Sequence, residues 1–371
     1  MKKLLAYLVS ASLAVAAPMA QSAGTASVKP SAQAGKTVAK AKKKVSRVTS
    51  KKRYRARTHK RVVSETQERR LHMSQSLAQA PLEVSYGVVE SSALNLRSAA
   101  VMVVDQKTGE ALYAKNPDVA TPIASITKLM TSMVVLDAGL PMTEEIVIGN
   151  EDVDRLKGSS SRLALGTTLS REELLHLALI ASENRAASAL SRSYPGGRPA
   201  FVQAMNAKAA ALGMSHTWFV DGTGLDSSNR STAADLVKLV DAASSYPLLR
   251  QITSTGQYGV TMPGRQVVRV KDHGRVRRVS REVMRQVAFN NTNALTRSPS
   301  WNIGLSKTGY INEAGHCLVM QANIADRPVI MVLLDSWGKL SRIGDAARVR
   351  KWLESQFSSG RLARLGDDPS V

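Results

Sequence analysis

The chain has 371 residues, 43% of them hydrophobic, so it can bury a substantial core and is not a wholly disordered polypeptide. Its single cysteine, Cys317, excludes an internal disulfide framework and any multi-cysteine zinc or iron–sulfur site. The six histidines show no paired metal-ligand spacing, so we expect no metal and no other cofactor. The formal net charge of +22 is concentrated in two stretches, residues 29–61 and 265–285.

The first 23 residues have the pattern of a secretory signal. Lys2 and Lys3 form a positive start, residues 4–17 are an apolar run, and residues 18–23 are mostly small. The apolar run is shorter than the roughly 20 residues that span a membrane. We therefore predict export to the periplasm, within the cell envelope, with cleavage near residues 20–23. An uncut anchor is the alternative.

Residues 24–84 are predicted to be a basic flexible linker. Residues 29–61 carry 14 Lys and Arg and no acid. A segment of this kind is solvated and often binds polyanions. Because export makes nucleic acid a poor partner, we expect either a plain spacer or contact with anionic polymers of the envelope.

Residues 85–357 carry the periodicities of one folded domain, and residues 358–371 are a short tail. A capping box, Ser170 with Glu173, marks the start of one helix. The pattern predicts strands at 99–105, 110–114, 302–311, 316–325 and 327–335, and helices at about 125–138, 170–182, 199–212, 232–244 and 343–356. Two early and three late strands predict an α/β (α+β) fold, in which an antiparallel sheet of about five strands is flanked by helices.

The basic stretch 265–285 has eight Lys and Arg against Asp272 and Glu282. Its sequence fits either an insertion near a cleft or an elongated hairpin.

The sequence S-I-T-K at residues 125–128 is the first candidate for chemistry. Residues three apart on a helix share a face, so the Lys128 amine can reach the Ser125 hydroxyl. A serine becomes a good nucleophile only when a base removes its proton. Burial and a neighbouring cation would lower the pKa of a lysine enough for that role.

Two further motifs follow in order. S-E-N at 182–184 supplies Ser182, whose hydroxyl can relay a proton, and Asn184, whose amide can bind substrate or the nearby lysine. K-T-G at 307–309 lies within a predicted strand. There Lys307 and Thr308 can hold a carboxylate, and Gly309 lets the backbone approach closely. On an edge strand this segment could pair with an extended peptide.

None of these motifs is specific alone. The chain also holds S-x-x-K at 336–339, S-x-N at 227–229 and 300–302, and K-T-G at 107–109. Position and context eliminate these copies, because 107–109 is a hairpin turn before any candidate serine and 336–339 follows the last K-T-G. The remaining serine and lysine motifs stand in the order used by penicillin-recognising serine enzymes.

The chain resembles the low-molecular-mass penicillin-binding proteins, the S11-type serine D-Ala-D-Ala peptidases, over roughly residues 85–355. The resemblance rests on TPIASITKLMT at 121–131, NAK at 206–208, ALGM at 211–214, GTGL at 222–225, NTN at 291–293 and KTGY at 307–310. S-E-N in place of S-G-N, and an end soon after the last helix, are most similar to the endopeptidase branch, the penicillin-binding protein 7 type. The basic linker and the stretch 265–285 depart from the family pattern.

The resemblance implies a transpeptidase fold shared with β-lactamases and a mechanism. Ser125 would attack a D-alanine carbonyl, Lys128 would take its proton, and Ser182 with Asn184 would help to protonate the leaving amine. Lys307 and Thr308 would orient the substrate carboxylate. Backbone N–H groups of Ser125 and Tyr310 would form the oxyanion hole.

The implied substrate is the peptide stem of peptidoglycan, with β-lactams as covalent inhibitors. Cleavage of D,D cross-links is the first expectation. Trimming of pentapeptides by a carboxypeptidase is the alternative, because both reactions place a carboxylate beside the cleaved amide. A β-lactamase uses the same motifs, and a non-catalytic envelope-binding protein is the rival from another class.

Overall fold

The computed structural model describes residues 81–86, 94–272 and 275–359. The predicted signal, most of the basic linker and nearly all of the C-terminal tail lie outside these described residues. Leu82 and Val84 already pack against the core, and the Ser85 N–H donates to the Gly109 carbonyl at 3.0 Å. Contacts of the folded domain therefore begin slightly before position 85.

Five antiparallel strands form the central sheet in the spatial order β2-β1-β11-β10-β9. Their bounds are β1 (Ser98–Asp105), β2 (Ala111–Lys115), β9 (Asn302–Ile311), β10 (Gly315–Ile324) and β11 (Arg327–Ser336). β1 pairs with β11 from Ser98↔Ser336 to Asp105↔Val329, so early and late segments of the domain meet inside the sheet. The predicted fold class is confirmed, and β9 lies at a sheet edge.

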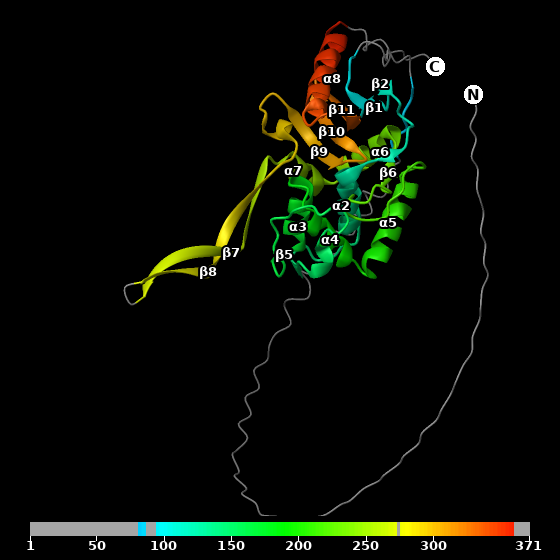
Figure 1. Cartoon of the computed structure of the whole chain (residues 1–371). Coiled ribbons are helices and arrows are strands. Elements are labelled where there is room, and N and C mark those ends of the chain that lie inside the picture. Colours follow the sequence, from blue (N-terminus) through cyan, green and yellow to red (C-terminus); the bar gives the residue numbers. More distant parts are fainter. Residues whose placement is uncertain (1–80, 87–93, 273–274, 360–371) are drawn as a thin grey trace, which may run out of the picture. The chain divides into compact units, whose positions relative to one another are not determined.

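Both faces of the sheet are buried, which explains the nearly continuous apolar runs of its strands. Along β1, Met102 belongs to a large core cluster with the helices that follow it, whereas Val103 packs in a second cluster with Val349 and Leu353. Successive strand residues point to opposite faces, so both sets must be apolar. Figure 1 shows α8 (Ser341–Ser358) on one side of the sheet and the larger helical group on the other.

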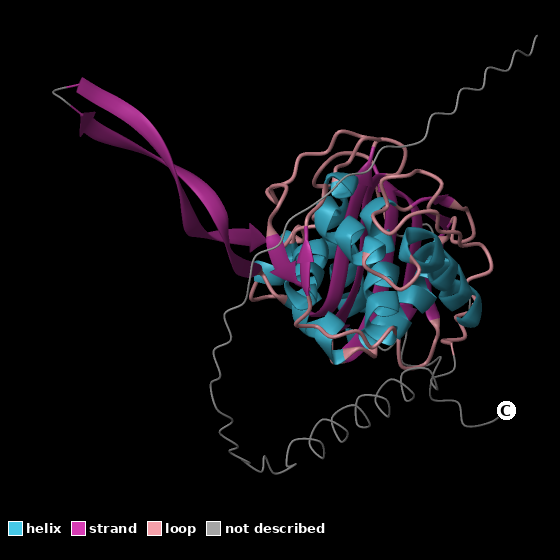
Figure 2. Ribbon diagram, turned by 90° about the horizontal axis from the view of Figure 1, so that it is seen from below, coloured by secondary structure: helices cyan, strands magenta, loops and turns pink. Residues whose placement is uncertain are grey.

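In the sequence, the larger helical group lies between strands β2 and β9. Figure 2 shows these helices against the sheet. The capping box is confirmed, because Ser170 Oγ accepts from the Glu173 N–H and Glu173 accepts from the Ser170 N–H. The helices are α2 (Thr127–Asp137), α3 (Arg171–Ile180), α4 (Asn184–Arg192), α5 (Gly197–Ala211), α6 (Ala233–Ser244) and α7 (Pro247–Ser254). Short turns and ladders join them: η1 (Ala124–Ile126), η2 (Asn150–Asp152), η3 (Ala294–Arg297), β3 (Thr121–Pro122) with β6 (Arg230–Ser231), and β4 (Glu145–Val147) with β5 (Thr168–Ser170).

Two helical predictions need correction. The single helix expected over 125–138 is a 3₁₀ turn, η1, followed by α2, because Ala124 adopts a left-handed φ of 48° just before Ser125. The helix expected over 170–182 ends at Ile180, and Ser182 has a φ of 59°. Both departures fall at residues that the motifs had singled out, where the backbone turns sharply.

The basic stretch 265–285 is an elongated hairpin, which decides between the two sequence expectations. It lies in β7 (Gln257–Asp272) and β8 (Arg275–Asn290), paired in unbroken register from Gln257↔Asn290 to Asp272↔Arg275. Figures 1 and 2 show this ribbon extending away from the helices. None of the helices within the described residues has the length and apolar character needed to cross a bilayer.

Candidate active site

Ser125 and Lys128 meet at the start of α2. The Lys128 ammonium donates to Ser125 Oγ at 2.7 Å, so the predicted pairing of hydroxyl and amine is present. Ser125 is half-buried and Lys128 is fully buried. The turn η1 presents the hydroxyl toward the amine one turn further along the chain. This is the arrangement that a serine nucleophile with an adjacent base requires.

Burial governs the protonation of Lys128. Desolvation lowers the pKa of its amine to about 7, while the negative charges of Asp221, Glu183 and Asp154 act to raise it. Of the two causes expected from the sequence, burial is the one that lowers this pKa, and the neighbouring charges that act on it are carboxylates with the opposite effect. A lysine with a pKa near 7 is partly neutral at neutral pH and can accept a proton.

Two acceptors besides Ser125 fix the Lys128 amine. It donates to Asn184 Oδ1 at 2.8 Å and to the Thr223 carbonyl at 2.6 Å. Asn184 in turn donates to Ser159 Oγ at 2.8 Å. The amine therefore has one position, aimed at Ser125, and Asn184 lies beside it as the sequence predicted.

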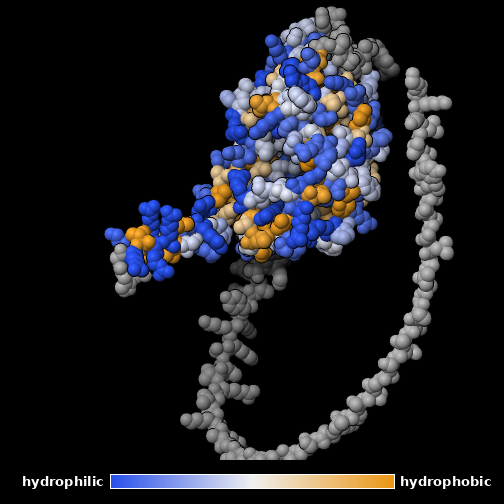
Figure 3. Space-filling model, viewed as in Figure 1, coloured by the Kyte–Doolittle hydropathy of each residue, from blue (hydrophilic) through white to orange (hydrophobic). Residues whose placement is uncertain are grey.

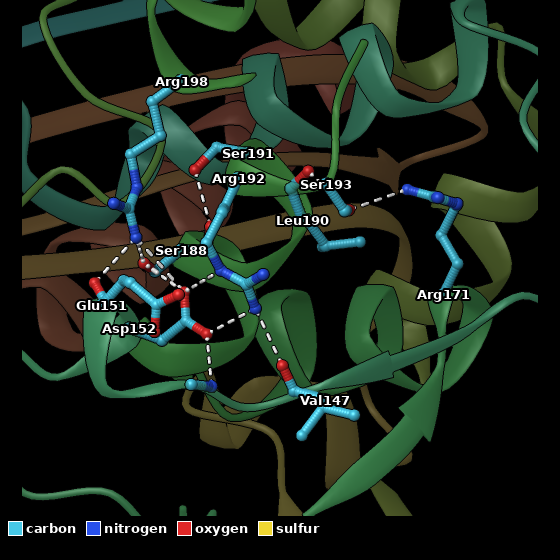
Figure 4. Close-up of polar contacts among 11 residues, drawn as sticks. Val147, Glu151, Asp152, Arg171, Ser188, Leu190, Ser191, Arg192, Ser193 and Arg198 are labelled. Atoms are coloured by element: carbon cyan, nitrogen blue, oxygen red, sulfur yellow. Dashed lines mark hydrogen bonds and ion pairs between the residues drawn. The ribbon is translucent and has the colours of Figure 1, made fainter. Parts of the chain in front are cut away.

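The Asn184 side chain is held by the placement of α4. Figure 4 shows the buried Asp152 carboxylate of η2 accepting hydrogen bonds from Ser188 and Arg192 of α4 and from Arg198 of α5. Asp152 also accepts from the Gly149 N–H. One carboxylate thus joins two helices to a turn, and this cluster fixes the helix that begins at Asn184.

The other two residues of the S-E-N motif face different surroundings. Ser182 Oγ accepts from the Lys307 ammonium at 2.9 Å, which joins the second motif to the third. Glu183 is buried and accepts from the Ser161 hydroxyl at 2.7 Å, and it lies 3.7 Å from Arg162. Glu183 is therefore engaged with Ser161 and Arg162.

Strand β9 supplies the opposite wall. Lys307 is fully buried, and desolvation, followed by the positive charges of Lys128 and Arg342, lowers its pKa well below the ordinary value. Its ammonium also donates to the Thr308 carbonyl at 2.8 Å. Tyr310 is exposed, and its ring stacks on His316 with centroids 4.3 Å apart.

Gly309 allows β9 to lie close to the serine turn. A Cβ at this position would lie 2.8 Å from the Ile123 carbonyl oxygen and 3.2 Å from the Ser125 backbone nitrogen. The predicted need for glycine is therefore confirmed as a steric one. The structure brings all eight predicted site residues into one region, from three separate segments of the chain.

Several residues of this site carried no role in the sequence interpretation. Thr223 contributes only its carbonyl, and Asp221 holds that turn by accepting from the Thr223 and Gly224 N–H groups. Thr292 Oγ1 accepts from the Thr308 hydroxyl at 2.6 Å. Segments 222–225 and 291–293 contributed to the family resemblance, which was the available signal for them.

The rejected motif copies have structural roles. Gly109 sits in the β1–β2 turn with φ 75°. The Ser336 hydroxyl is buried and bonds Ser98 Oγ at 2.6 Å, and Asn229 accepts from the Val220 N–H. Cys317 is buried in the core, and burial raises the pKa of its thiol to about 11. The described residues contain no group of three or more His, Cys, Asp or Glu placed to hold a metal ion.

Comparison with known sequences agrees with this geometry. A family model described as D-alanyl-D-alanine carboxypeptidase, peptidase S11, matches residues 87–338. The D-alanyl-D-alanine endopeptidase of Pseudomonas aeruginosa is 47% identical over 260 residues, covering 70% of this chain and 78% of that protein. The D-alanyl-D-alanine endopeptidase of Escherichia coli is 44% identical with the same coverage.

Solved structures are similar at the level of the fold. The Streptomyces K15 DD-transpeptidase superposes with a TM-score of 0.60 and 28% identity, covering 70% of this chain and 97% of that one. Penicillin-binding protein D2 of Listeria monocytogenes, in its ampicillin-bound form, gives a TM-score of 0.56 with 30% identity, covering 70% and 98%.

Proposed function

The chain belongs to the peptidase S11 family and is a serine-type D,D-peptidase, and from this premise we propose that it is an endopeptidase that cleaves D,D cross-links in peptidoglycan. The substrate follows from the D-alanyl-D-alanine endopeptidases of Pseudomonas aeruginosa and Escherichia coli, to which the chain is similar. The observation that carries the chemistry is the 2.7 Å contact between Ser125 Oγ and a lysine whose pKa is lowered to about 7.

In the acylation step, Ser125 Oγ attacks the carbonyl carbon of a D-alanine residue while the neutral Lys128 amine takes the hydroxyl proton. The resulting oxyanion would accept hydrogen bonds from the backbone N–H groups of Ser125 and Tyr310. When the C–N bond breaks, the leaving amine takes a proton through Ser182, which Lys307 holds. Water then hydrolyses the ester and regenerates Ser125.

Substrate binding is proposed for β9. As an edge strand, it can pair with an extended peptide through its free backbone groups. Lys307 and Thr308 would orient the carboxylate next to the cleaved amide, with Asn184 on the other side of the substrate. The same groups would hold the carboxylate of a β-lactam, whose ring amide would acylate Ser125.

A carboxypeptidase activity is the second candidate, and the description of the matching family favours it. A terminal D-alanine and the D-centre of a cross-link both place a carboxylate beside the cleaved amide. One site can therefore perform both reactions, and the shape of the surrounding groove decides between them.

The activity is tested by mass spectrometry of purified muropeptides after digestion. Loss of cross-linked dimers is expected for the endopeptidase, whereas shortening of pentapeptides alone would assign the carboxypeptidase. Many turnovers of free penicillin per enzyme would instead indicate a β-lactamase.

Ser125→Ala should abolish labelling by a fluorescent penicillin, because it removes the hydroxyl that Lys128 would deprotonate for attack. Ser336→Ala is the matched control, since Ser336 belongs to the second S-x-x-K sequence and is buried against Ser98. This control should label normally. Labelling that survives Ser125→Ala would refute the assignment of the nucleophile.

For the segments outside the described residues, we retain the sequence-based proposal. Residues 1–23 would direct export to the periplasm and be cleaved near residues 20–23. Residues 29–61, within the linker 24–84, would act as a spacer or would contact anionic polymers of the envelope.

A further inference from the structure

The β7–β8 hairpin has a base that belongs to the domain and an outer part that does not pack on it. At the base, Tyr258 stacks on His176 with centroids 4.1 Å apart, and the Arg162 guanidinium lies 3.7 Å from the centroid of the Phe289 ring. From Arg265 to Arg285, every side chain that the structure describes is exposed or half-buried. Figures 1 and 2 show this outer part projecting from the helices.

Both faces of the outer hairpin carry four Lys or Arg residues. One face holds Arg265, Arg269, Lys271 and Arg278 with the carboxylate of Glu282, and the other holds Arg275, Arg277, Arg281 and Arg285. On the first of these faces Arg269 is directly opposite Arg278, Lys271 is the next residue of β7 on the same face, and Arg265 is opposite Glu282. Like charges directly opposite each other destabilise a strand pair. No carboxylate among the described residues lies within ion-pair distance of Arg269 or Arg278. An anionic partner that neutralised this face would relieve the repulsion.

Large apolar side chains lie on that same face. Val267, Val276 and Met284 are 64%, 59% and 65% exposed, and the pairing register places all three on the face of Arg269 and Arg278. Figure 3 shows hydrophobic and hydrophilic surface interleaved on the outer hairpin. A soluble polyanion would use the charges but would leave the apolar groups in water. A lipid surface contacts both sets of side chains, because its phosphates attract the charges and its acyl boundary accepts the apolar groups.

We propose that the outer hairpin, residues 265–285, docks on the surface of an anionic phospholipid bilayer. Arg269 and Arg278 bind lipid phosphates, and Val267, Val276 and Met284 enter the boundary between headgroups and acyl chains. The ribbon lies in the interface and does not cross the bilayer, because its two edges carry backbone groups that hydrocarbon would leave unsatisfied.

A local probe tests this contact in the full-length chain. Val276→Cys is labelled with an environment-sensitive dye, and Cys317 stays unlabelled because it is fully buried. Vesicles containing phosphatidylglycerol should shift the dye emission to shorter wavelength, and pure phosphatidylcholine vesicles should not. The control label is at Gln203→Cys, an exposed position of α5. No shift at 276, or an equal shift at 203, overturns the proposal.

Substitutions separate a membrane from a soluble polyanion. The double variant Arg269→Gln with Arg278→Gln should weaken binding to phosphatidylglycerol vesicles about 30-fold, from two lost charges near the surface. Its charge-matched control, Arg250→Gln with Lys351→Gln, changes exposed residues of α7 and α8 and should bind as the parent does. Equal binding by the hairpin variant and the parent overturns the proposal.

A second pair, Val267→Ser with Val276→Ser, keeps every charge. It should weaken vesicle binding and leave binding to inorganic polyphosphate unchanged. If vesicle binding is also unchanged, the partner is a soluble polyanion and the membrane proposal is wrong. All variants keep residues 29–61, so any contribution of that segment is constant, and labelling of Ser125 by penicillin confirms that each variant is folded.

Discussion

At the scale of single residues, the protonation of Lys128 determines when Ser125 can react. Burial lowers the pKa of Lys128 to about 7, and only the neutral amine can take the serine proton. Acylation should therefore rise with pH up to about 7 and then level off. Below that pH it should fall about tenfold per unit. The measurement is the second-order rate of labelling by a fluorescent penicillin between pH 5 and pH 9.

Glu183→Gln identifies the titrating group. Removing a nearby negative charge disfavours the ammonium form, so the pKa of Lys128 falls and the acid limb of the profile moves to lower pH. Asp118→Asn, at an exposed position, is the control and should leave the limb in place. An unmoved limb in Glu183→Gln would mean that another group limits acylation.

Gly224 sets the distance between the Asp221 turn and the serine turn. It has a φ of 78°, and a Cβ there would lie 2.0 Å from the Ala124 carbonyl oxygen. Gly224→Ala should push away the neighbouring Thr223 carbonyl, which holds Lys128, and should slow labelling of Ser125 by about tenfold or more.

Gly166→Ala is the matched control for this clash. Gly166 has nearly the same φ, 80°, but a Cβ there would meet nothing within 4 Å. It should lose about 1 kcal/mol of stability from backbone strain and label at the parental rate. If both variants label equally slowly, backbone strain and not the clash explains the effect.

At the scale of elements, Asp152 joins η2, α4 and α5. Asp152→Ala removes the acceptor shared by Arg192, Arg198 and Ser188. The free energy of unfolding should fall by about 3 kcal/mol, the lower end for a broken buried pair, because both arginines are partly exposed. Glu354→Ala breaks a surface pair on α8 and should cost less than about 1 kcal/mol. Urea unfolding measures both losses of stability, provided that the dependence of the free energy on urea concentration is the same in each variant as in the parent. Equal losses would contradict a special role for Asp152.

The elements differ in how far sequence could predict them. Strands β10 and β11 were predictable because both faces are buried and the apolar runs are long. Helices α4 and α7 were not predicted, since α4 is rich in alanine and serine and gives little apolar periodicity. For α4 the consequence is functional, because its first residue is Asn184, which binds Lys128.

The same limit applies inside the site. Ser125, Lys128 and Lys307 could be predicted because a side chain of a given type carries their chemistry. The Thr223 carbonyl could not, since every residue has one and only the fold brings this one to Lys128. The position of Ser125 in a 3₁₀ turn likewise depends on the left-handed backbone at Ala124. Alanine has no intrinsic preference for that conformation, so the sequence does not indicate it.

At the scale of the whole molecule, the buried lysines that the proposed catalysis requires lower the stability of the fold. Lys128 and Lys307 are fully buried, and desolvation lowers the pKa of each. In the unfolded chain the Lys128 amine regains its ordinary pKa of 10.5. Between about pH 7 and 10.5, the unfolded state therefore binds one more proton at this position than the folded state. Stability must then rise with pH in that window, as the penalty for burying this lysine is relieved.

Lys128→Met isolates this effect, because methionine fills a similar volume and does not titrate. From pH 7.5 to 9.5, the free energy of unfolding of the parent should gain about 1.4 kcal/mol per pH unit relative to the variant. Hydrogen bonds lost at Asn184 and Thr223 change the variant by a constant amount and leave this slope difference intact. Urea unfolding at several pH values gives the slopes. Parallel curves would mean that Lys128 stays charged in the folded protein, and it could not then serve as the base for Ser125.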